Sequence, residues 1–108
     1  MTRIIDRFGT GSPVFSFEFF PPKSDEGAEA LMATVLDLQE AVSPDYVSVT
    51  YGAGGTTRER TQQVVSRIQN QIGLPAMAHL TCVAATVGEI DEVVNRLVAD
   101  GIENILAL

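Results

Sequence analysis

Four polar side chains stand near the ends of predicted strands, where they could carry out proton transfer. Glu18 lies inside the phenylalanine-rich segment 14–20, while Thr50, His79 and Thr81 close the next two predicted strands. An ionised carboxylate that loses water without gaining a partner is strongly destabilised, so Glu18 in this segment suggests a chemical role. Partly buried among aromatic rings, it could act as a general acid or base. The alternative is a strand-end glutamate bonded to a neighbouring threonine or a lysine.

Other kinds of catalytic site receive less support from the sequence. His79 is the only histidine and Cys82 the only cysteine, so no ligand set with metal-binding spacing is present. We expect Cys82 to serve packing and not to act as a nucleophile. His79 could contact a ligand, or it could be a core histidine bonded to backbone. The glycines of segment 52–55 could admit a flat or anionic ligand, or simply form a tight turn.

Alternating strands and helices must position these side chains. Short apolar segments at 14–20, 45–51, 75–82 and 103–108 predict four strands, with helical patterns between them. The pattern β-α-β-α-β-α-β makes neighbouring strands parallel.

Helix boundaries can be read from capping residues. The predicted ends are Ser24 and Pro44 for the first helix, Thr56 or Thr57 and Gly73 for the second, and Thr86 and Gly101 for the third. Thr86 and Glu89 have the spacing of a capping box, and glycine favours the end of a helix.

Side-chain alternation along the strands distinguishes an open doubly wound sheet from a barrel. Successive strand residues point to opposite faces. The predicted helix-facing residues are Phe15, Phe17, Phe19, Val47, Val49, Ala78, Leu80 and Cys82, and the opposite face carries Ser16, Glu18, Phe20, Ser48, Thr50, Met77, His79 and Thr81. One apolar and one increasingly polar face favour a barrel, because an open sheet with helices on both sides would be apolar on both faces.

A complete (β/α)8 TIM barrel needs roughly 200 residues or more, whereas this chain has 108. We therefore interpret residues 1–108 as the N-terminal half of one barrel domain, truncated after its fourth strand. The alternative is that two copies pair as a homodimer to cover the open sheet edges.

Composition excludes several classes of protein. The net charge is −7 and the basic residues form no dense run, which argues against a nucleic-acid binder or an anionic membrane surface as partner. No apolar segment predicts a membrane span or a secretory signal. A single cysteine permits no internal disulfide, and we expect a cytoplasmic protein.

Three segments, in this order and spacing, resemble the N-terminal part of methylenetetrahydrofolate reductases. They are FSFEFFPPK (15–23), VSVTYGAGG (47–55) and AHLTC (78–82), and the resemblance extends over the whole chain. The closing ENILAL is similar to the segment that precedes the family's Arg-Gly-Asp motif, which this chain lacks.

The resemblance implies a flavin-dependent (β/α)8 barrel that holds FAD at the C-terminal ends of its strands. A reduced nicotinamide, NADH or NADPH, would pass hydride to the flavin, which would reduce 5,10-methylenetetrahydrofolate to 5-methyltetrahydrofolate. The implied protein is an oxidoreductase of one-carbon and methionine metabolism that acts on CH–NH donors and binds a folate, and we expect a homo-oligomer.

The resemblance also implies roles for individual residues. Glu18 would be the general acid that opens the folate's five-membered ring. Thr50 would lie by the flavin and the nicotinamide, and Tyr51, Ala53 and His79 would contact the flavin. The 108-residue chain alone is expected to hold FAD weakly and to be inactive. Two alternatives are a non-enzymatic half-barrel homodimer and another pterin-binding barrel enzyme without flavin.

Overall fold

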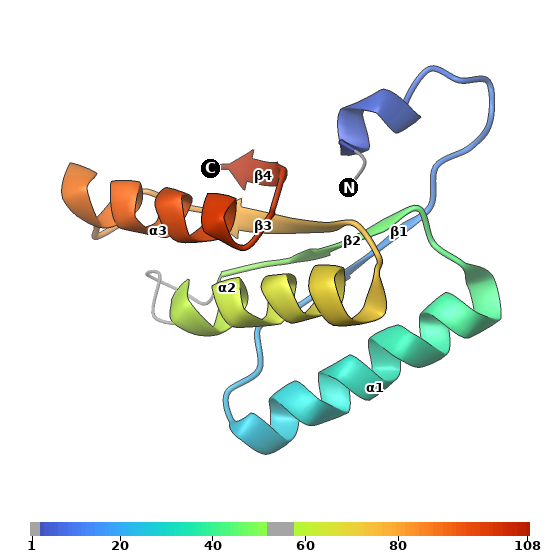
Figure 1. Cartoon of the computed structure of the whole chain (residues 1–108), viewed down its shortest axis with the longest axis horizontal. Coiled ribbons are helices and arrows are strands. Elements are labelled where there is room, and N and C mark those ends of the chain that lie inside the picture. The colour runs from blue at the N-terminus through green and yellow to red at the C-terminus, as the bar shows by residue number, and fades with distance from the viewer. Residues whose placement is uncertain (1–2, 52–57) are drawn as a thin grey trace.

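The computed structural model describes residues 3–51 and 58–108 and contains a four-stranded parallel sheet (Figure 1). The strands, in the spatial order β1-β2-β3-β4, are β1 (Ser16–Phe19), β2 (Tyr46–Val49), β3 (Ala76–Leu80) and β4 (Asn104–Ala107). The helices are α1 (Asp25–Val42), α2 (Arg58–Arg67), the π-helix η3 (Ile68–Ile72) that continues it, α3 (Val87–Ala99) and an N-terminal 3-10 helix, η1 (Ile4–Arg7). The predicted parallel α/β pattern is therefore confirmed.

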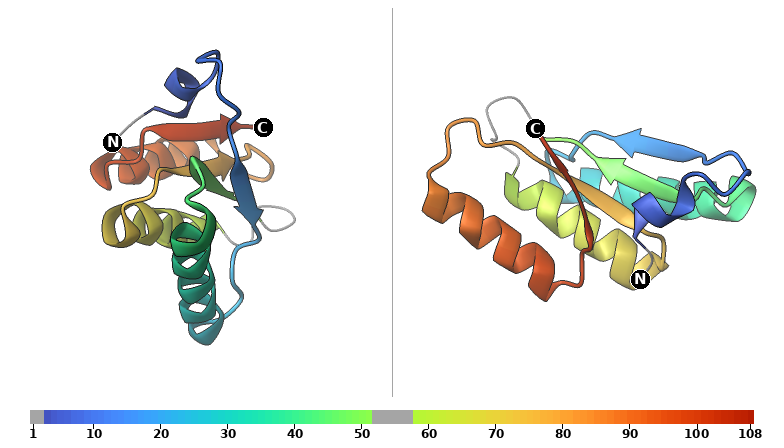
Figure 2. Two further views of the ribbon diagram at one scale, coloured as in Figure 1. Left: turned by 90° about the vertical axis from the view of Figure 1, so that its right-hand side faces the viewer. Right: turned by 90° about the horizontal axis from the view of Figure 1, so that it is seen from above.

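The three long helices lie on the same side of the sheet (Figures 1 and 2). Each strand pairs with the next strand in the chain, without a reversal of order. The common doubly wound sheets change direction within their first four strands, so this arrangement differs from them. The opposite face of the sheet carries none of the three long helices.

Strand alternation is confirmed for the two central strands. Val47 and Val49 of β2, and Ala78 and Leu80 of β3, are buried in the core beneath the helices. The helices contribute to this core Met32, Val35, Val64, Val65, Ile68, Val93 and Leu97. Burial of these side chains supplies the main favourable free energy for packing the helices on the sheet.

The prediction that Phe15 and Phe17 lie under helices is wrong. Phe15 is 67% exposed and Phe17 is 36% exposed, while Phe19 packs against the edge of the core. Alternation decides which face a side chain occupies, but burial also needs an element above that face. Here α2 packs on β2 and β3, and β1 is an edge strand that extends beyond this cover.

Cys82 also departs from its prediction, because it is exposed and not packed. The third strand ends at Leu80, two residues before Cys82. The alternation that assigned Cys82 to the helix-facing side therefore does not extend to it.

The predicted helix caps are largely confirmed. Ser24 Oγ accepts a hydrogen bond from the Gly27 backbone N–H at 3.0 Å. Helix α1 ends before Ser43, which has a φ of 45° and is followed by Pro44. The helix η3 ends before Gly73, which has a φ of 84°. The predicted start of the second helix, at Thr56 or Thr57, lies outside the described residues, and the π-helical turn was not predicted.

The helix η1 is a further feature that the sequence patterns did not predict. Ile4 is buried, and its backbone N–H donates to Asn104 Oδ1 at 2.8 Å, at the start of β4. Asp45, just before β2, accepts a hydrogen bond from Arg7 at 3.2 Å and another from the Phe15 backbone N–H at 2.8 Å. These contacts fasten the N-terminal segment to the starts of the strands.

None of the helices in the described ranges combines the length and apolarity needed to cross a bilayer.

The capping box of α3 gives a first prediction. Thr86 Oγ1 accepts from the Glu89 backbone N–H at 3.1 Å, and the Glu89 carboxylate accepts from the Thr86 backbone N–H at 3.2 Å. Thr86→Ala should lower the free energy of unfolding by about 1 kcal/mol, measured by urea denaturation. Thr34→Ala, in the interior of α1, is the control, because alanine favours helix and should not destabilise there. Equal losses in both variants would contradict the capping role.

The same box predicts a pH dependence. The hydrogen bond from the Thr86 backbone lowers the pKa of Glu89 below its ordinary value of 4.5. Because the folded-state pKa is lowered, this stabilisation is present above the ordinary pKa and is lost as pH falls through the lowered one. The difference in unfolding free energy between wild type and Glu89→Gln should therefore shrink as the pH drops below about 4.5. A difference that stays constant in denaturation series through this range would refute the assignment.

Candidate active site

Three neighbouring strands bring polar side chains to one carboxylate oxygen. Glu18 of β1 is in register with Ser48 of β2, on the face of the sheet opposite the long helices. Ser48 Oγ donates a hydrogen bond to Glu18 Oε1 at 3.0 Å. His79 Nε2, from β3, lies 3.0 Å from the same Oε1. The predicted convergence of Glu18 and His79 is therefore confirmed.

The two partners of Glu18 are buried, whereas Glu18 itself is open to solvent. Ser48 is 4% exposed, and the side chain of His79 is 9% exposed against 58% for Glu18. The expectation that Glu18 is partly buried among aromatic rings is thus wrong, and Phe20, the ring expected on the same face, is itself 83% exposed. Among the described residues, His79 Nε2 makes no aligned hydrogen bond, so it approaches Glu18 Oε1 closely without the geometry of a hydrogen bond.

Ser48 is the residue of this cluster that sequence reasoning missed as a functional group. Its small hydroxyl could equally have filled space inside a barrel. The signal that could have found it was its alternation, which put Ser48 on the same face as Glu18 in the adjacent strand. Which residues stand opposite each other depends on register, and register becomes known only when the strands pair.

Thr50 carries a buried hydroxyl without a protein partner among the described residues. Its backbone is well anchored, because its N–H donates to the Phe19 carbonyl and its carbonyl accepts from Thr61 Oγ1, both at 2.9 Å. Its own Oγ1 is buried and makes no hydrogen bond with any described residue. Buried polar atoms are nearly always paired, so an unpaired hydroxyl at a strand end indicates a place for a ligand atom.

Three further residues were predicted to belong to the site: Thr81, Tyr51 and Ala53. Thr81 Oγ1 accepts from the Val83 backbone N–H at 3.2 Å, which uses it in a local turn. Tyr51 is half-buried against the core, and burial raises the pKa of its hydroxyl, an effect opposed by nearby Arg58. Ala53 lies outside the described residues.

Arg58 is a positively charged residue near these strand ends that had no predicted role. Its guanidinium lies 3.7 Å from the Glu89 carboxylate and donates to the Val83 carbonyl at 3.5 Å. Its Nε is buried and has no hydrogen-bond partner within residues 3–51 and 58–108. Arg58 thereby links the start of α2 to the region where β3 leads into α3.

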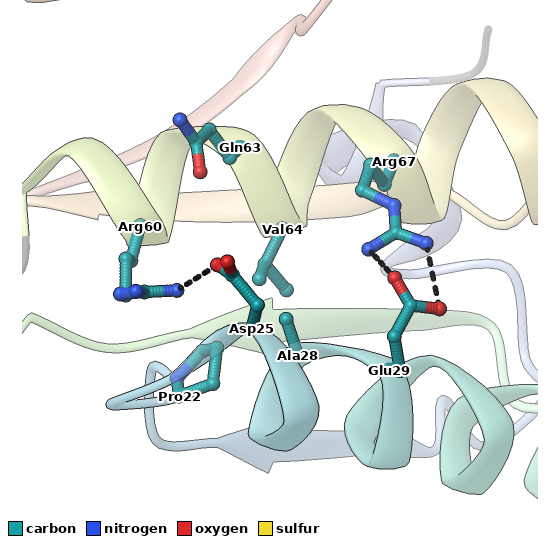
Figure 3. A pocket seen from close by; sticks show the side chains of 8 residues that line it. All are labelled: Pro22, Asp25, Ala28, Glu29, Arg60, Gln63, Val64 and Arg67. Atoms are coloured by element: carbon teal, nitrogen blue, oxygen red, sulfur yellow. Dashed lines mark hydrogen bonds and ion pairs between the residues drawn. The ribbon is translucent and has the colours of Figure 1, made fainter.

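A hollow between α1 and α2 is a second candidate, and its charges are already paired (Figure 3). Arg60 contacts Asp25 at 3.2 Å, and Arg67 contacts Glu29 at 2.8 Å. Exposed pairs of this kind contribute little to stability. Because each cation has an acidic partner, we interpret the hollow as a helix–helix contact and not a ligand site. Within the described residues, no cluster of three or more acidic, histidine or cysteine side chains could hold a metal.

The family of this chain follows from its similarity to known proteins. The sequence model of the methylenetetrahydrofolate reductase family matches residues 2–108. The chain belongs to this family. Membership confirms the resemblance drawn from segments 15–23, 47–55 and 78–82.

Individual methylenetetrahydrofolate reductases agree with this assignment. The chain is 40% identical over 106 residues to methylenetetrahydrofolate reductase (NADH) 1 of Zea mays, which covers 98% of the chain and 18% of that protein. It is 41% identical over 98 residues to methylenetetrahydrofolate reductase (NADH) 1 of Arabidopsis thaliana, covering 91% of the chain and 16% of that protein. It is 40% identical over 93 residues to 5,10-methylenetetrahydrofolate reductase of Escherichia coli K12, covering 86% and 31%. The chain thus spans less than a third of the length of these relatives.

Thr50, directly after β2, and Thr61, in α2, allow a matched test of the unpaired hydroxyl. Thr50→Val removes a buried hydroxyl that has no partner among the described residues, so the free energy of unfolding should stay unchanged or rise by up to about 1 kcal/mol. Thr61→Val removes a hydroxyl that is bonded to the Thr50 carbonyl, and should cost about 1–3 kcal/mol. Urea denaturation of the two variants measures both effects. A large loss of stability in Thr50→Val would show that its hydroxyl has a structural partner.

Proposed function

We propose that residues 1–108 form the first half of a (β/α)8 barrel domain and that the complete polypeptide is a flavin-dependent methylenetetrahydrofolate reductase. It would reduce 5,10-methylenetetrahydrofolate to 5-methyltetrahydrofolate with electrons from NADH or NADPH. Family membership supports this reaction. The observation that carries the proposal is the Glu18 carboxylate, held on the open face of the sheet by Ser48 and His79.

The half-barrel interpretation is supported by the order of the strands and by their open edges. Strands follow one another in chain order with the long helices on one side, as in a barrel. In a closed barrel, β1 and β4 would each gain a second neighbour. A further helix outside β1 would cover Phe15 and Phe17, whose exposure therefore fits this interpretation.

The residues at the strand ends fit an FAD site. The buried Thr50 hydroxyl, which no described residue pairs, could hydrogen-bond a flavin heteroatom, and Tyr51 offers an adjacent, half-buried ring. His79 lies on the same face of the sheet, and Ala53 follows Tyr51 in the chain. When bound, FAD would supply a two-electron carrier that accepts hydride from the nicotinamide and delivers it to the folate.

Glu18 is suited to donate a proton to the folate. Its exposed carboxyl group can reach a substrate on the open face of the sheet. Transfer of its proton to one nitrogen of the folate's five-membered ring would let the bond between that nitrogen and the bridging carbon break, with the bonding electrons staying on the protonated nitrogen. The lone pair of the other ring nitrogen would then form a reactive iminium with the bridging carbon. Glu18 would be left as a carboxylate beside Ser48 and His79.

The pairing of two half-barrels in a homodimer is the alternative favoured by the free edge of β1 and the exposed Phe15 and Phe17. Light scattering on the 108-residue chain distinguishes a homodimer of half-barrels from one half of a larger barrel. A stable dimer would support the alternative, and a monomer or an aggregate would support the interpretation as part of a larger barrel.

The acid role of Glu18 predicts a split between the two half-reactions. In the complete polypeptide, Glu18→Gln should leave reduction of FAD by the nicotinamide nearly unchanged. Oxidation of the reduced flavin by methylenetetrahydrofolate should slow by about 10²–10⁴-fold, because the proton donor is lost. Stopped-flow flavin absorbance follows both steps.

Glu40→Gln, on the exposed surface of α1, is the control and should behave as wild type. Equal slowing of both steps in Glu18→Gln would contradict the acid role. A complete polypeptide that takes up no FAD during titration would refute the flavin-dependent function, and would favour a pterin-binding enzyme without flavin.

A further inference from the structure

We propose that Ser48 and His79 are positioning residues that fix the orientation of the Glu18 carboxyl group, so that Oε2 carries the transferred proton. This inference rests on the proposed function of Glu18 as the acid. It gives Ser48 a role in the reaction, and it assigns His79 to the acid in addition to any contact with the flavin.

The two contacts distinguish the oxygens of the carboxyl group. Ser48 Oγ donates to Oε1 at 3.0 Å, and His79 Nε2 lies 3.0 Å from that same oxygen. A protonated carboxylic acid has one hydroxyl oxygen and one that only accepts. Because Ser48 already donates to Oε1, this oxygen serves as the acceptor, and the proton belongs on Oε2.

Burial of the two partners makes them a rigid support. Ser48 lies between Val47 and Val49, both fully buried, and His79 lies between the buried Ala78 and Leu80. Glu18 is largely exposed and has a long side chain that would otherwise sample many rotamers. Catalytic groups act well only when they are held close to the productive geometry. Residues of the two central strands therefore restrict the conformations of the Glu18 side chain, which is exposed on an edge strand.

The same contacts favour the product of proton transfer. When Glu18 gives up its proton, negative charge develops on the carboxylate. Hydrogen bonds to an ionised group are stronger than those to a neutral one. The hydrogen bond from Ser48 should therefore stabilise the charge that develops during the reaction more than it stabilises the starting acid, which is the requirement for catalysis.

The first experiment compares half-reactions in the complete polypeptide. Ser48→Ala should slow flavin oxidation by methylenetetrahydrofolate by about 10- to 100-fold through loss of orientation. Flavin reduction by the nicotinamide should stay within about twofold of wild type, since its geometry does not involve Glu18. Ser48→Thr, which keeps the hydroxyl, should restore most of the lost rate. Ser16→Ala, on the same face of β1 and in register with Tyr46, is the matched control and should not change either step.

The outcomes separate the inference from the proposed function. A wild-type polypeptide that cannot reduce methylenetetrahydrofolate overturns both. If wild type is active and Ser48→Ala keeps the full folate rate, or slows both steps equally, the positioning role alone is overturned.

The second experiment tests the contact in the complete polypeptide without any reaction. The imidazole signal of His79 in a ¹H–¹³C NMR spectrum is assigned by its loss in His79→Gln. Glu18→Gln should shift this signal, whereas Glu40→Gln should leave it in place. An unmoved signal in Glu18→Gln would show that the contact is absent and would overturn the inference.

Discussion

Register between parallel strands is the constraint on which the candidate site depends. Backbone pairing sets Glu18 beside Ser48, and the next pairing brings His79 close enough for its Nε2 to reach the same carboxylate oxygen. A slip of one residue in β1 would turn Glu18 to the helix-facing side and a phenylalanine to the open face. The buried valines of β2 oppose such a slip in that strand, because it would bring them to the open face. Core packing and site geometry are thus two consequences of one alignment.

Polar groups between the helices have partners, whereas some buried polar groups at the strand ends do not have one among the described residues. Between α1 and α2, the arginines have acidic partners at the surface, and that region is complete without a ligand. At the strand ends, the buried Thr50 hydroxyl and the Nε of Arg58 have no hydrogen-bond partner in the part of the chain that the structure describes. Unpaired buried groups reduce stability, and proteins tolerate them mainly where function requires them. This contrast, more than the size of any hollow, distinguishes the strand ends as the functional region.

Much of the local structure could be predicted because it depends on short-range chemistry. The Thr86–Glu89 capping box, the Ser24 cap and the glycine at position 73 each act within a few residues, so sequence spacing was sufficient. The exposure of Phe15 and Phe17 could not be predicted in the same way, because it depends on whether a helix lies above β1. The helix η1 escaped prediction for a related reason, since its anchor Asn104 lies 100 residues further along the chain.

The sequence by itself determined the parallel α/β pattern, the family, and the two faces of the central strands, because hydrophobic alternation and helix caps are properties of neighbouring residues. It also singled out Glu18, Thr50 and His79 as candidate site residues. Only the tertiary structure decided that Ser48 and His79 meet at one oxygen of Glu18, and that Glu18 is exposed while its partners are buried. Distances across strands and solvent exposure arise from how separate segments pack, and no local pattern specifies them.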